Sequence, residues 1–96
     1  MSPMITYADN PSAHHFEARD GESVAGFIDY RVPDATHVDL LHTEVDDAHQ
    51  GQGIASALVR AALEEARSKG RKVIATCPYV TRWLQHHPGE FDDLLS

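Results

Sequence analysis

A helical repeat enclosed by two strand-like segments constrains this fold more than any other feature. Within residues 53–69, apolar side chains recur at intervals of three and four positions on one side, and arginine and glutamate occupy the other. Residues 36–45 before this repeat and residues 72–77 after it have the apolar, β-branched composition of strands. A strand, a helix and a strand in that order predict a βαβ unit with parallel strands and a right-handed crossover.

The segments before this unit predict antiparallel strands. Residues 13–19 and 23–32 alternate weakly between apolar and polar side chains. Each is followed by a turn-forming stretch, RDGE at 19–22 and VPDA at 32–35. We therefore expect a three-stranded antiparallel meander that leads into the βαβ unit.

The two ends of the chain complete the expected domain. Residues 1–11 are polar and contain proline, so we expect them to be loosely ordered. Residues 12–96 are expected to form one domain of the α/β (α+β) class, with a single modest core. Pro78 ends the second parallel strand, and Thr81 is expected to cap a short C-terminal helix over residues 82–87.

The charge balance limits the partners of the protein. Asp and Glu number 15 against 8 for Lys and Arg, which gives a formal charge of -7. This charge disfavours a nucleic-acid surface and suits a basic protein or a polyamine. The start of the chain has no basic region followed by an apolar run, and no apolar run is long enough to span a bilayer. We therefore expect a cytoplasmic protein with no membrane partner, as a monomer or a weak dimer.

Cysteine and histidine usage argues against a disulfide and a metal site. Cys77 is the single cysteine, so any chemical role for it is that of a lone thiol. The histidines include the adjacent pairs 14–15 and 86–87, and neighbours on a strand or helix point apart rather than toward one ion. We expect no bound metal.

The start of the central helix lacks the residues that usually cap one. The junction at residues 50–53 reads QGQG, without Ser, Thr, Asp or Asn. Two explanations stand. Either Asp46 or Asp47 folds back as the cap, or the free backbone N–H groups bind an anion such as phosphate, which the glycines allow to approach closely. The P-loop and dinucleotide-binding motifs do not match, since no Lys-Ser or Lys-Thr pair follows and a third glycine is missing.

Residues 42–66 (HTEVDDAHQGQGIASALVRAALEEA) resemble motif A of the GNAT superfamily of N-acetyltransferases. The core of that motif is Gln/Arg-x-x-Gly-x-Gly/Ala, and residues 50–55 (QGQGIA) match each of its fixed positions. With CPYV at 77–80 and HHP at 86–88, the resemblance extends over residues 13–95 to a branch of very small, single-domain GNAT proteins.

The resemblance implies that acetyl-CoA binds across two parallel strands that splay apart. The family's pattern assigns the pyrophosphate to backbone N–H groups near residues 51–55, and the pantetheine to the edge of the strand that ends at Val45. The implied coenzyme-binding residues are Val45, Gln50, Gly51, Gln52, Gly53, Ile54, Ala55 and Ser56. The family usually has helices between its first and second strands, where this chain has only the turn at 19–22. Those helices commonly help form the acceptor site, so the resemblance does not extend to the acceptor.

Acetyl transfer to an amine needs a base for the amine, donors for the oxyanion and an acid for the departing thiolate. A backbone N–H near Val45 is the candidate oxyanion donor. On strict alternation His42 and Glu44 share one face of their strand and Asp39 lies on the other. Each of these three is a candidate base, and for each a purely structural role stays open.

Cys77 has two interpretations. It accepts the acetyl group from the thioester and passes it on, or it is a small buried side chain that closes the strand end. Tyr79 is the candidate acid, with packing over the core as its alternative role. The sequence thus predicts an enzyme that transfers acetyl from acetyl-CoA to an amine, a lysine side chain or a polyamine, directly or through Cys77. The alternative is a module that binds coenzyme A or an acyl form without turnover, as a sensor or interaction partner.

Overall fold

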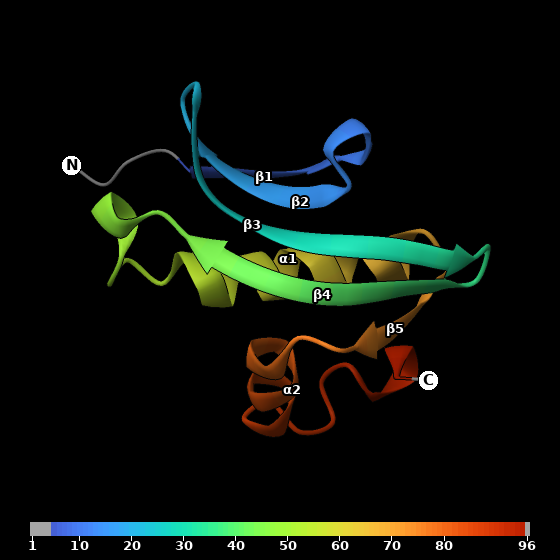
Figure 1. Cartoon of the computed structure of the whole chain (residues 1–96). Helices are drawn as coiled ribbons and strands as arrows, with labels where there is room; N and C mark the ends of the chain where they lie inside the picture. The colour runs from blue at the N-terminus through green and yellow to red at the C-terminus, as the bar shows by residue number, and fades with distance from the viewer. Residues whose placement is uncertain (1–4, 96) are drawn as a thin grey trace.

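The computed structural model describes residues 5–95, which form one sheet and two helices. The strands are β1 (Ile5–Asn10), β2 (His15–Asp20), β3 (Ser23–Asp34), β4 (His37–Val45) and β5 (Lys72–Ala75). The helices are α1 (Ile54–Ser68) and α2 (Pro78–Gln85), and the 3-10 turns are η1 (Pro11–Ala13), η2 (Asp47–His49) and η3 (Asp92–Leu94). The strands stand in the order β1-β2-β3-β4-β5, and only β5 runs parallel to its neighbour (Figure 1). No helix in this described part of the chain has the length and apolar character needed to cross a membrane.

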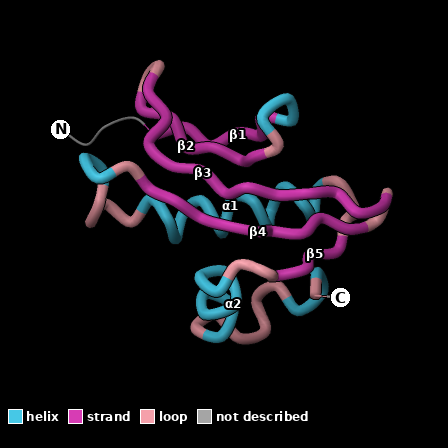
Figure 2. Tube along the Cα trace, viewed as in Figure 1, coloured by secondary structure: helices cyan, strands magenta, loops and turns pink. Residues whose placement is uncertain are grey.

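α1 packs against one face of the sheet. Figures 1 and 2 show it behind β3 and β4, while α2 follows the end of β5 and lies alongside β4. The buried residues of α1 recur with the helical period and are Ile54, Leu58, Val59, Ala62, Leu63 and Ala66. They join Phe16, Ile28, Leu40 and Val73 from the strands in a single apolar core. This helix layer therefore holds the start of α1 against the end of β4.

The α+β class and the βαβ unit predicted from the sequence are confirmed. The helix expected over residues 53–69 spans Ile54–Ser68, and it joins the parallel neighbours β4 and β5. β5 ends at Ala75, two residues earlier than expected. Beyond that point the chain leaves the sheet and enters α2.

The N-terminal segment differs from the expectation of loose order. Residues 5–10 form β1, which pairs along its whole length with β2. Ile5 and Tyr7 pack half-buried against the core. An edge strand is held by hydrogen bonds to its neighbour, so this short segment becomes a strand through its pairing with β2 rather than through its own sequence pattern. The meander therefore has four strands, and residues 1–4 lie outside the described residues.

α2 begins at Pro78 rather than after Thr81. Proline suits the first position of a helix because its ring already holds a helical φ and its missing N–H would have no partner there. Cys77 is the N-cap, with the extended backbone (φ -66, ψ 124) that a residue before proline prefers. The Thr81 hydroxyl donates back to the carbonyls of Ala75 and Cys77 instead of capping the helix start.

β4 and β5 separate in the middle of β4, in agreement with the splayed strands that the family resemblance implies. Their pairing stops at Leu40 and Ala75, although β4 continues to Val45. The Cys77 N–H still donates to the Leu40 carbonyl at 2.8 Å, and this is where the strands part. A bulge in β4 occurs at the same place, because Tyr30 pairs with Leu40 and Asp29 with His42, which leaves Leu41 without an opposite residue.

Candidate functional site

The loop before α1 has a tightly constrained backbone. Gly51 (φ +81) and Gly53 (φ +75) both adopt the left-handed conformation that other residues avoid. The Gln50 side chain donates through Nε2 to the Val45 carbonyl at 3.0 Å, so the loop is tied to the end of β4. The two glycines and Gln50 therefore fix how the chain leaves β4 and enters α1.

No side chain within residues 5–95 caps the start of α1. Gly53 is the N-cap residue, and the first turn contains no acidic side chain. Asp46, one of the alternative caps, uses its carboxylate to accept from His49 Nδ1 at 3.1 Å, and Asp47 opens η2. The first N–H groups of α1 are thus open to an external acceptor, and the helix dipole favours an anion there.

A hollow of about 110 Å³ opens at this helix start. It brings together nearly all the residues that the family resemblance implies for coenzyme binding. Its lining residues are Val45, His49, Gln50, Gly51, Gly53, Ile54, Ala55, Ser56 and Tyr79. Gln52 is the only one of the expected coenzyme-binding residues that does not line it, and none of the lining residues is acidic.

His49 is a residue of this hollow that sequence reasoning missed. Its two ring nitrogens each lie 3.1 Å from a carboxylate oxygen, Nδ1 from Asp46 and Nε2 from Asp20. The hydrogen bond to Asp20 and then the one to Asp46 raise the pKa of His49. Asp20 ends β2, so His49 ties the glycine loop to the β2–β3 hairpin. No local pattern signals this contact, because the partner lies 29 residues away.

Cys77 lies at the point where β4 and β5 separate, with only 3% of its surface exposed. Its sulfur is 3.4 Å from the Thr43 hydroxyl, a contact that sequence reasoning also missed. Burial raises the pKa of the Cys77 thiol, but hydrogen bonds from Thr43 and from the backbone near Tyr79 and Val80 outweigh it, and the net pKa is lowered. Tyr79 is exposed at 36% and lines the hollow, so it does not pack over the core.

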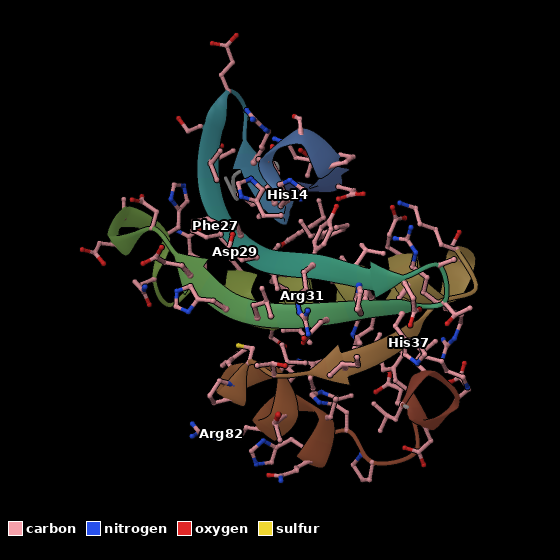
Figure 3. The ribbon with its side chains drawn as sticks, turned by 45° about the vertical axis from the view of Figure 1, so that its right-hand side comes forward. His14, Phe27, Asp29, Arg31, His37 and Arg82 are labelled. Atoms are coloured by element: carbon pink, nitrogen blue, oxygen red, sulfur yellow. The ribbon has the colours of Figure 1, made fainter. Side chains whose placement is uncertain are left out.

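The bulge changes which side chains share a face of β4. Directly opposed residues on neighbouring strands share a face, and Asp29 opposes His42 while Arg31 opposes Asp39. Since Asp29 and Arg31 are two apart on β3, they also share a face, which Figure 3 shows along the front of that strand. Asp39 therefore lies on the same face as His42 and Glu44, which corrects the expectation from strict alternation. The extra residue in the bulge, Leu41, reverses the alternation.

The candidate bases have different surroundings on that shared face. Asp39 is only 3% exposed, and its carboxylate accepts from Arg31 Nε at 3.1 Å and from Thr76 Oγ1 at 2.5 Å. His42 and Glu44 are exposed. Asp39 thus joins β3, β4 and the end of β5 within the sheet, whereas His42 and Glu44 are accessible to a molecule that approaches this face.

Comparisons with known proteins agree with this geometry. A model of the family described as GCN5-related N-acetyl-transferase matches residues 15–94. Protein NATD1 from Gallus gallus and from Homo sapiens are each 43% identical over 51 residues, which is 53% of this chain and 46% and 45% of those relatives. The chain therefore spans about half the length of the curated relatives it matches.

Two solved structures have a similar fold. The NMR solution structure of a candidate GCN5-like N-acetyltransferase from Staphylococcus aureus superposes with a TM-score of 0.69 and 28% identity, over 100% of this chain and 91% of that one. The crystal structure of Ard1 from Thermoplasma volcanium superposes with a TM-score of 0.54 and 28% identity, over 62% of this chain and 41% of that one.

Proposed function

The chain belongs to the GCN5-related N-acetyltransferase family, and we propose that it binds acetyl-CoA and transfers the acetyl group to an amine. The observation that carries this proposal is the uncapped start of α1 beside the separated strands β4 and β5. The helix start provides N–H donors for phosphate. The end of β4, which β5 does not pair with, provides backbone N–H and C=O groups for the pantetheine.

The hollow at the helix start fits the phosphate end of acetyl-CoA. Backbone N–H groups near residues 51–55 and the Ser56 hydroxyl are donors, and the lining has no carboxylate to repel an anion. The pantetheine is assigned to the edge of β4 near Val45, where β5 no longer pairs with it. Bound in this way, acetyl-CoA supplies an acetyl thioester close to Cys77.

The acceptor is proposed to be a basic amine, such as a lysine side chain or a polyamine. A second hollow of about 370 Å³ lies beside the end of β4 and is lined by Phe27, Glu44, Asp46 and Asp47, among others. Its carboxylates attract a protonated amine. Glu44 or the exposed His42 then removes the proton that the amine must lose before it attacks.

Two routes for the acetyl group follow from the position of Cys77. In the direct route the deprotonated amine attacks the thioester carbonyl, the C–S bond breaks, and the coenzyme leaves as a thiolate that takes a proton from Tyr79. The nitrogen then loses its excess proton, which restores Tyr79 by way of solvent. In the relay route the Cys77 thiolate attacks first, so the new S–C bond replaces the bond to the coenzyme sulfur. The amine then attacks the S-acetyl group, gives its proton to the base and releases Cys77 as a thiolate.

The alternative, a coenzyme-binding module without turnover, is favoured by one observation. Only the short turn η1 stands between β1 and β2. With β1 identified, this is the place between the first and second strands where the family usually has its helices, rather than the turn at 19–22. A site without those helices has fewer groups to hold an acceptor.

Thermal unfolding with and without acetyl-CoA tests the shared premise. A ligand at about 100 times its dissociation constant stabilises the native state by roughly 2.7 kcal/mol. An unchanged unfolding temperature at saturating acetyl-CoA would contradict both functions. If the unfolding temperature rises, the release of free thiol from acetyl-CoA is measured with a panel of primary amines. Thiol release above the buffer rate supports acetyl transfer, and release at the buffer rate with every amine supports the binding module. Mass spectrometry of protein incubated with acetyl-CoA, with Cys77→Ser as the control, then separates the relay route from the direct one.

A further inference from the structure

Ser56, in the first turn of α1, has a hydrogen-bond partner on α2. The indole Nε1–H of Trp83 donates to Ser56 Oγ at 2.8 Å. An indole N–H is only a donor, so the serine oxygen is the acceptor in this contact. Among the described residues, Trp83 is the only hydrogen-bond partner of this hydroxyl. The proton of the hydroxyl is therefore left for another acceptor, and Ser56 lines the hollow at the helix start.

The indole is held firmly in this orientation. Trp83 is 4% exposed and stacks on His87, with ring centroids 3.8 Å apart and planes 17° from parallel. Phe91 contacts it at a centroid distance of 5.8 Å, and the Arg60 guanidinium lies 5.2 Å from its centroid. A side chain packed on several sides keeps one rotamer, so the N–H stays directed at Ser56.

Ser56 does not use its proton within its own helix. A helical serine commonly donates to the carbonyl four residues earlier in its own chain, which removes its proton from a ligand. Among the described residues Ser56 makes no such bond, and its oxygen instead accepts from Trp83 on α2. A hydroxyl whose oxygen already accepts one hydrogen bond presents its proton to the ligand, and a phosphate oxygen is a strong acceptor.

We propose that Trp83 is a positioning residue for the pyrophosphate of acetyl-CoA, because its N–H orients the Ser56 hydroxyl as a donor into the hollow. This inference rests on the proposed function, since it needs acetyl-CoA at the start of α1. Trp83 itself does not touch the ligand. Its hydrogen bond also joins α2, which begins directly after Cys77, to the helix end that holds the phosphates. This partly buried hydrogen bond thereby connects the two ends of the proposed acetyl-CoA site.

The test compares two ligands with variants of the full chain. Dissociation constants for acetyl-CoA and for acetyl-pantetheine, which has no phosphate, are measured by calorimetry or by NMR shifts. The variants are Trp83→Phe, which keeps an aromatic ring and removes the N–H, Ser56→Ala, and the double variant. Phe16→Leu is the matched control, since it makes a core aromatic substitution on β2 and leaves the Trp83 indole with its His87 and Phe91 ring contacts in place.

We expect Ser56→Ala to weaken acetyl-CoA binding about tenfold and Trp83→Phe about threefold, from the loss of one hydrogen bond and of its orientation. The double variant should bind no more weakly than Ser56→Ala, and Phe16→Leu should bind as the wild type does. Acetyl-pantetheine should bind all variants equally.

Three results overturn the inference. Trp83→Phe binds acetyl-CoA with wild-type affinity, or it loses affinity for both ligands to the same extent, or the two substitutions add in the double variant. Failure of the proposed function is a separate outcome, because it shows as a wild type that binds no acetyl-CoA.

Discussion

The hydroxyl oxygen of Thr43 lies 3.4 Å from the sulfur of Cys77, across the gap where β4 and β5 part. This contact places a hydrogen-bond donor beside the only thiol of the chain. Burial raises the pKa of a thiol, and the Thr43 hydroxyl is one of the hydrogen-bond donors, with the backbone near Tyr79 and Val80, that lower the pKa of Cys77.

Thr43→Val should therefore raise the pKa of Cys77, and Thr43→Ser should restore it. Valine keeps the shape of threonine and removes the hydroxyl, so the thiolate loses a donor in a buried place. The measurement is the ultraviolet absorbance of the thiolate against pH, with Cys77→Ser as the blank that subtracts tyrosine ionisation. An identical titration in Thr43→Val and the wild type would show that this hydroxyl does not act on the sulfur.

Substitutions of Gly53 should separate backbone strain from ligand binding. A Cβ at Gly53 meets open space, so Gly53→Ala costs only the strain of positive φ, about 1 kcal/mol. Gly53→Glu carries the same strain and adds a carboxylate where we propose that phosphate binds. We expect both variants to fold, and acetyl-CoA to raise the unfolding temperature of Gly53→Ala but not of Gly53→Glu. If acetyl-CoA stabilised the two variants equally, phosphate binding at the start of α1 would be contradicted.

Asp39→Asn should lower stability and keep turnover. Asparagine retains an acceptor for Thr76 but loses the charge of the buried carboxylate that accepts from the exposed Arg31 side chain, which costs roughly 1–3 kcal/mol. A general base typically contributes about a hundredfold or more to the rate, so its loss is easily distinguished. The measurement is thiol release at a temperature below the unfolding transition, compared among Asp39→Asn, His42→Gln and Glu44→Gln. A folded Asp39→Asn protein without turnover would make Asp39 the base.

Stability should fall as the pH rises through the raised pKa of His49. The hydrogen bonds to Asp20 and Asp46 favour the protonated ring in the folded state, so their contribution is complete below the ordinary pKa of 6.5. It disappears once the ring loses its proton in the folded protein as well. Unfolding temperatures across this range, compared with His49→Gln, isolate the effect from that of the other histidines. If the unfolding temperatures of the two proteins changed with pH in parallel, the hydrogen bonds of His49 to Asp20 and Asp46 would not be the source of the pH dependence.

Glu17 should give the opposite dependence at acid pH. This carboxylate is 5% exposed, and burial raises its pKa, but hydrogen bonds from Arg19, Asn10 and His15 outweigh burial and lower the pKa to about 2. Its contribution to stability is therefore present above its ordinary value of 4.5 and is lost as the pH falls toward 2. Urea unfolding at several pH values should show the free energy of unfolding falling with pH in the wild type. The same free energy should depend less steeply on pH in Glu17→Gln. If the free energy of unfolding depended equally on pH in both proteins, other carboxylates would cause the acid sensitivity.

The sequence determined the elements that depend on local order. The apolar period of residues 53–69 predicts α1 because a helix turns its buried side chains to one face every 3.6 residues. The QGQG junction itself offers no capping side chain, although only the structure shows that neither Asp46 nor Asp47 folds back as the cap. Pro78 predicts the extended backbone at Cys77. These features need no distant partner, so they can be read along the chain.

The tertiary structure decided the contacts between segments far apart in sequence. β1 forms only because β2 lies beside it, and the bulge at Leu41 arises from the register between β3 and β4. That single extra residue places Asp39 on the face of His42 and Glu44, because the side chains of a strand alternate and one insertion reverses all that follow. The partners of Cys77, His49 and Ser56 likewise come from elements that meet only when the sheet and its helices pack.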